Sequence, residues 1–198
     1  MRFLKLASLV AFLLFFPQLV GAEELLARNA SRQLLHDVSD YLDWIPEEIL
    51  PQSERTAMLD AANSSFGDHR KKDGAGYQLT YQFHTQQVLA FTTLVVTDRK
   101  GGAAKAAEGF MKLIRLNMEK QGHQLRPIKA PAEFPYSAEL YTEVADGVPF
   151  GNVFVITHGE HMYASRIAGG GGFERFEETS EYLTPKLKAA MEFTPQLD

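Results

Sequence analysis

The chain contains no cysteine among its 198 residues. This absence excludes disulfides, cysteine nucleophiles, thiolate metal ligands and a lipid-modified cysteine behind an export signal. An exported domain of this size can fold without disulfides when its hydrophobic core is large enough. Because exported eukaryotic proteins often carry disulfides, the lack of cysteine favours a bacterial periplasm over a eukaryotic secretory route.

Positive charge is scarce. Lysine and arginine number 20 against 25 acidic residues, which gives a formal net charge of −5. A mildly acidic chain lacks the electrostatic footprint of a nucleic-acid-binding protein. It also shows no polybasic run for an anionic membrane surface. We therefore expect no nucleic-acid partner, and we expect the partner to be an envelope protein or a small ligand.

Long apolar runs are rare as well, and the most prominent one lies near the N-terminus. Arg2 and Lys5 form a short positive region, and residues 6–20 are mostly apolar. Val20-Gly21-Ala22 then places small residues where signal peptidase cleaves. The run is too short for a comfortable transmembrane helix. We expect cleavage after Ala22, a periplasmic or secreted location and no transmembrane span after cleavage; the alternative is an uncleaved anchor.

Established catalytic motifs are missing. There is no G-x-S-x-G nucleophile elbow. The serine of Ser137-Ala138-Glu139 belongs to a predicted strand with ordinary alternation, so it does not indicate a hydrolytic triad. The four glycines at 169–172 precede a predicted helix and can be read as a phosphate cradle. They lack the Lys-Ser/Thr of a P-loop, and acidic residues follow them. A flexible strand-to-helix connection is the alternative, and we expect the chain not to be an enzyme.

The densest group of potential metal ligands is His158, Glu160 and His161. On a hairpin tip these three side chains can converge, and imidazole with carboxylate suits zinc. The spacing differs from the His-Glu-x-x-His of a helical metalloprotease. The alternative is a solvated turn in which Gly159 supplies an unusual backbone angle. The sequence thus predicts no cofactor, with zinc at His158, Glu160 and His161 as the alternative.

Two further features are candidates for binding. Residues 31–43 place apolar side chains on one helical face, which can dock on the domain as a lid or face a partner. Several aromatic residues can line a ligand groove, although such residues more often belong to the core. These aromatic residues are Tyr77, Tyr81, Phe134, Tyr136, Tyr141 and Tyr163.

The hydrophobic pattern changes along the chain from the period of 3.6 that is typical of helices to the period of two that is typical of strands. Residues 23–65 have helical spacing, and Ser64 to Gly76 is expected to be an exposed polar loop. Beyond it we expect a hairpin, a helix at 103–121, four strand candidates and a closing helix. The hairpin strands cover Leu79 to Phe83 and Val88 to Thr97. The four later candidates cover Gln124 to Ala130, Ser137 to Val144, Phe150 to Thr157 and His161 to Ile167.

This order predicts an α+β fold. The sheet should be mainly antiparallel, with five to six strands flanked by helices as an α/β/α sandwich, and with an extra N-terminal helical segment. The expected divisions are a signal peptide at 1–22, a helical segment and loop at 23–76, and the sandwich domain at 77–198. Pro127 marks Gln124 to Ala130 as an edge strand.

The element order from residue 77 to 193 resembles the PsbP-like and DcrB-like α/β/α sandwich. The resemblance is carried by three stretches and a turn: Ala90 to Val96, Gly151 to Ile156, the turn His158-Gly159-Glu160, and the closing helix with Phe173, Phe176 and Met191-Glu192-Phe193. The segment 23–65 has no counterpart in that pattern. Members are mostly small exported or lumenal accessory proteins without catalysis, so the resemblance implies a binding or assembly role.

Two functions follow from these observations. The first is an exported, non-catalytic binding or accessory protein of the periplasm or cell envelope. The alternative is a metal-binding protein or a metal-dependent hydrolase that uses His158, Glu160 and His161.

Overall fold

The computed structural model describes residues 31–42, 44–45, 47–48, 50–52, 54–55, 66–70, 76–85 and 88–195, with residues 66–70 described as backbone only. The predicted signal peptide at 1–22 lies outside these residues, as does most of the stretch 53–65, the last part of the segment for which helical spacing is predicted.

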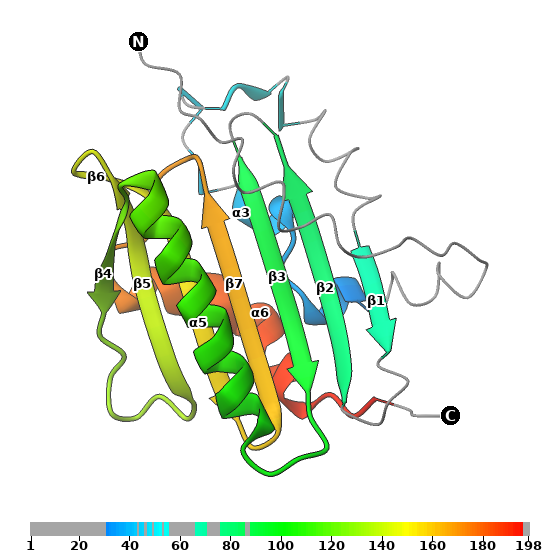
Figure 1. Ribbon diagram of the computed structural model, residues 1–198. Helices are drawn as coiled ribbons and strands as arrows, with labels where there is room; N and C mark the ends of the chain where they lie inside the picture. Colours follow the sequence, from blue (N-terminus) through cyan, green and yellow to red (C-terminus); the bar gives the residue numbers. More distant parts are fainter. Residues whose placement is uncertain are drawn as a thin grey trace.

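The described residues form one seven-stranded sheet in the order β1-β2-β3-β7-β6-β5-β4 (Figure 1). Every neighbouring pair of strands is antiparallel. The strands are β1 Phe66–Arg70, β2 Tyr77–His84, β3 Leu89–Val96, β4 Gln124–Ile128, β5 Ser137–Ala145, β6 Val148–His158 and β7 His161–Ala168. β4 is an edge strand, as its proline predicted.

Helices cover both faces of the sheet. Helix α5 (Gly102–Gln121) lies across one face, while α6 (Phe176–Glu192) and the short α3 (Val38–Leu42) lie behind the other (Figure 1). Gly122 ends α5 with φ 71°, the left-handed conformation that glycine adopts most easily. No helix among the described residues has the length and apolarity needed to cross a bilayer. The α+β fold with helices on both faces is therefore confirmed.

Two local expectations were wrong. Residues 66–70 were expected to be loop, but they pair with β2 from Phe66 opposite Tyr81 to Arg70 opposite Tyr77. The sheet therefore has seven strands, not the five to six predicted. Pairing with a neighbouring strand thus decided a segment whose own composition favours a loop. The second concerns Phe150, the first residue of the strand predicted from Phe150 to Thr157, because alternation along that strand predicts that Phe150 shares a face with Phe154. It falls at a β-bulge, where Gly151 pairs with Glu143 and Pro149 with Val144, and it packs against Leu89 and Ala168 instead.

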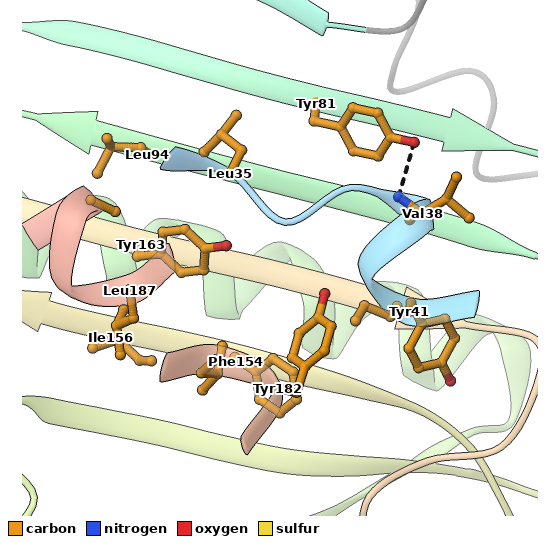
Figure 2. Packing of buried hydrophobic residues seen from close by; sticks show 14 of the residues in the cluster. Leu35, Val38, Tyr41, Tyr81, Leu94, Phe154, Ile156, Tyr163, Tyr182 and Leu187 are labelled. Atoms are coloured by element: carbon orange, nitrogen blue, oxygen red, sulfur yellow. Dashed lines mark hydrogen bonds between the residues drawn. The ribbon is translucent and has the colours of Figure 1, made fainter. Parts of the chain in front are cut away.

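Each face of the sheet has its own core. The smaller core lies under α5 and contains Ala103, Ala107, Met111, Ile114, Met118, Val153, Val155, Met162 and Ala164. The larger core lies under α6 and includes Tyr81, Leu94, Phe154, Ile156, Tyr163, Ile167, Tyr182, Leu183 and Leu187. Figure 2 shows how side chains from β2, β3, β6, β7 and α6 meet there.

The described residues between 31 and 55, which we call the strap, complete the larger core. Leu35, Val38 and Tyr41 are buried against the sheet and α6 (Figure 2). The Arg55 guanidinium donates hydrogen bonds to the backbone carbonyls of Leu42, Ile45 and Leu50, which holds the turns of the strap together. The strap therefore docks on the domain and buries its apolar face.

Candidate functional site

The turn between β6 and β7 carries the predicted metal ligands. His158 and His161 pair across the ladder, so their side chains leave the same face of the sheet. The His158 ring lies edge-on to Tyr136, with 5.4 Å between centroids. The His161 Nε2 contacts the backbone oxygen of Phe193 at 2.7 Å. Glu160 accepts a hydrogen bond from the Thr97 hydroxyl at 3.1 Å.

The three side chains are thus held by three different partners. In the part of the chain that the structure describes, no group of three His, Asp or Glu side chains is placed to hold a metal ion. The zinc site at His158, Glu160 and His161 stays a prediction, and Glu160 and His161 would have to leave their present partners to form it.

We expect zinc to leave the melting temperature of the untagged protein unchanged. Binding to the folded state would raise it, because a ligand stabilises the state to which it binds. The measurement is a thermal melt with and without zinc, together with elemental analysis of the purified protein. A rise of several degrees that His158→Asn abolishes would show that the turn binds the metal. His84→Asn is the matched control, because His84 is also exposed and lies at the end of β2 that is far from this turn.

The glycine run at 169–172 forms a close-packed link between β7 and α6. A Cβ added to Gly172 would lie 2.5 Å from the backbone oxygen of Gly151. The backbone N–H of Gly169 donates to the Phe150 carbonyl at 2.8 Å. Asn152 fixes the end of the link, because its side chain both accepts from the Phe173 N–H and donates to the Phe173 carbonyl.

The phosphate-cradle interpretation is therefore wrong, because it requires these glycines to form the start of the following helix. Helix α6 begins at Phe176, beyond the glycines, so their backbone amides do not form its first turn. The alternative, a flexible connection, also needs correction, because close contacts and hydrogen bonds hold the link in place. At Gly172, glycine is required because any side chain would collide with the backbone of Gly151.

The six aromatic residues do not line one groove. Tyr77, Tyr81 and Tyr163 are buried in the larger core. Tyr141 lies on the opposite face of the sheet, where its ring contacts the Arg115 guanidinium. Phe134 and Tyr136 contact each other at the edge of the larger core. Alternation along the strands sends these residues to both faces of the sheet.

A buried polar network joins the strap to the sheet and to α6. The backbone N–H of His36 donates to the Tyr163 hydroxyl oxygen at 3.1 Å. The same hydroxyl contacts Nδ1 of His36, while Nε2 of His36 contacts the Tyr182 carbonyl at 2.8 Å. Because a carbonyl only accepts, Nε2 carries the ring proton and Nδ1 accepts from Tyr163. Burial, with the positive charge of Lys186, lowers the pKa of His36 to about 3.

Two further contacts anchor the strap. The Tyr81 hydroxyl accepts the backbone N–H of Val38 at 3.1 Å (Figure 2). The Lys186 ammonium on α6 donates to the Leu35 carbonyl at 3.0 Å and to the Asp40 carboxylate. Burial raises the pKa of Asp40, although the hydrogen bond from Lys186 opposes the shift. Each of these anchors thus uses a side chain, and the five side chains involved, His36, Asp40, Tyr81, Tyr163 and Lys186, are all titratable.

A second buried network lies on the α5 face. Glu143 on β5 accepts from Arg166 on β7 through Nε at 2.9 Å and through a terminal nitrogen at 2.8 Å. It also contacts Nδ1 of His123, just beyond α5, at 2.6 Å. Burial disfavours the charged carboxyl, but the hydrogen bonds from His123 and Arg166 outweigh it and lower the pKa of Glu143. Gln121 accepts from Arg166 at 3.3 Å.

Sequence reasoning missed both networks. The sequence contained one indication of the Glu143 network. Arg166 follows Met162 and Ala164 at every second position of β7, so it lies on the same buried face. A charged residue in such a row needs a buried partner. His36 similarly stands among Leu34, Leu35 and Val38. No local pattern identifies the partners, since Tyr163 lies 127 positions from His36.

Comparison with known proteins assigns no relative. No family model, no curated protein and no solved structure matches the chain.

Proposed function

We propose that this chain is an exported, non-catalytic binding or accessory protein of the periplasm or cell envelope, whose partner is an envelope protein or a small ligand. One observation carries the proposal: the buried ionisable groups that were described above pair with one another across secondary-structure elements. Glu143 is held by Arg166 and His123, and His36 is held by the Tyr163 hydroxyl and by the backbone carbonyl of Tyr182. These groups join elements of the fold, and both ring nitrogens of His36 and both carboxylate oxygens of Glu143 already have partners.

The arrangement of the elements gives secondary support. An antiparallel sheet with helices on both faces agrees with the PsbP-like resemblance seen in the element order. A fold alone does not determine a function, so the proposed accessory role rests mainly on the pairing of the buried ionisable groups.

The export part of the proposal predicts a processed N-terminus. The full chain with a C-terminal tag, expressed in a bacterium with two membranes, should appear in the periplasmic extract beginning at Glu23. Mass spectrometry of the intact protein measures this directly. Ala22→Leu should block processing, because signal peptidase requires a small residue there, whereas Ala22→Ser should not. An intact Met1 terminus in the cytoplasmic fraction would contradict export.

The non-catalytic part of the proposal predicts no turnover. Purified mature protein should not hydrolyse generic ester, phosphate or peptide substrates above buffer. Hydrolysis that a single substitution in the protein abolishes would overturn this part. Cross-linking in intact cells, followed by purification through the tag, then identifies the partner.

A further inference from the structure

The strap is attached to the domain differently from every strand. Among the described residues, no backbone-to-backbone hydrogen bond joins the strap to the sheet or to α6. Its polar attachments instead use the side chains of Tyr163, Tyr81 and Lys186, along with His36, Asp40 and Tyr41 of the strap itself. The ladder of the sheet would therefore remain hydrogen-bonded if the strap left it.

His36 is the attachment that depends on a proton. In the docked strap its Nδ1 is an acceptor, so a proton on Nδ1 would face the oxygen of Tyr163. If Tyr163 then accepted from Nδ1, its own O–H would lose its partner in the buried core. His36 is 1% exposed, so water cannot replace the lost hydrogen bond.

The charges around His36 do not favour an imidazolium. Lys186 on α6 is positive and already bonded to Asp40. Asp37 on the strap accepts from the backbone and the hydroxyl of Ser39. The other titratable neighbours are tyrosines, namely Tyr41 on α3, Tyr81 on β2, Tyr163 on β7 and Tyr182 on α6, and burial raises the pKa of each of them. The tyrosines therefore stay neutral in acid and offer no compensating negative charge.

We propose that the strap is an acid-sensitive latch, in which protonation of His36 releases residues 31–45 from the sheet and uncovers the face formed by Tyr81, Tyr163 and Tyr182. The sign follows from linkage. The released strap binds a proton on His36 with an ordinary pKa of 6.5, whereas the docked strap binds it only near pH 3. Docking is therefore strongest above pH 6.5 and weakens as the pH falls through the window between these two values.

Hydrogen exchange measured by mass spectrometry tests the latch. From pH 7 to pH 5, after correction for intrinsic exchange rates, protection of peptides that cover residues 31–42 should fall about 25-fold, the ratio that the two pKa values of His36 give. Protection of β7 peptides should fall much less. His36→Asn should lose this pH dependence, while His158→Asn, which changes an exposed histidine, should keep it. Equal loss of protection in β7, or an unchanged dependence in His36→Asn, would overturn the latch.

A second measurement on the unmodified protein covers the case in which His36→Asn does not fold. Trp44 is the single tryptophan of the chain. It belongs to the strap, and its ring lies 4.9 Å from that of Phe173, edge to face. In a urea titration at pH 5, Trp44 fluorescence should change at a lower urea concentration than far-ultraviolet circular dichroism. At pH 7 the two transitions should lie closer together. Coincident transitions at pH 5 would refute the latch.

Discussion

Glu143→Gln should lower the free energy of unfolding by about 3–5 kcal/mol, the range for removing one partner of a buried ion pair. The Glu143 carboxylate is fully buried and holds both the Arg166 guanidinium and His123. An amide of the same shape leaves the positive charge of Arg166 without compensation in a nearly dry environment. Urea unfolding at pH 7, followed by circular dichroism, gives the value.

Two variants make this result specific. Glu174→Gln removes a carboxylate from the exposed pair with Arg126, and it should change stability by less than about 1 kcal/mol. The double variant Glu143→Leu with Arg166→Met should be more stable than Glu143→Gln, because it buries no unpaired charge. A loss below about 1 kcal/mol for Glu143→Gln would mean that water reaches the network.

The same pair also predicts a pH dependence. The folded-state pKa of Glu143 lies below its unfolded value. Its contribution to stability is therefore fully present above the unfolded pKa and is lost as the pH falls through the folded pKa. Glu143→Gln lacks this titration, so its stability should fall less steeply between pH 5 and pH 3 than that of the unmodified protein.

Phe154→Ala should also cost about 3–5 kcal/mol, the usual range for removing a buried phenylalanine side chain. Phe154 is 0% exposed on β6, and its ring contacts those of Phe173 and Tyr182 at centroid distances of 6.4 and 6.0 Å. The cavity would lie between the sheet and α6, beside the rings of Phe173 and Tyr182 in the larger core.

Val148→Ala is the matched control on the same strand. Val148 is 64% exposed, so its truncation should change stability by less than about 0.5 kcal/mol. Equal losses for Phe154→Ala and Val148→Ala would contradict the placement of the larger core under α6. The comparison requires only urea midpoints, because both changes lie on β6.

Local pattern explains why most elements could be predicted. Helix α5 ends at Gln121 before Gly122, and the hairpin of β2 and β3 follows the change of period near residue 77. In these segments the side-chain spacing, the capping glycine and the turn residues all favour the same structure. The edge position of β4 followed from Pro127, because proline cannot donate a ladder hydrogen bond.

The local sequence pattern did not predict the structure where a contact with a residue distant in the sequence determines it. The strand β1 exists through its pairing with β2, and Phe150 leaves the period-two alternation at a bulge between β5 and β6. The close packing of Gly172 depends on Gly151, twenty-one positions earlier in the chain. Spacing within one segment contains no information about such contacts.

The sequence by itself determined the absence of thiol chemistry, the acidic charge balance and the alternation of apolar residues that builds a two-faced sheet. The tertiary structure alone decided which polar groups meet: Glu143 with Arg166 and His123, and His36 with the Tyr163 hydroxyl and the Tyr182 backbone carbonyl. The physical reason is that periodicity specifies the face on which a side chain lies, whereas a buried hydrogen bond depends on which strands and helices become neighbours.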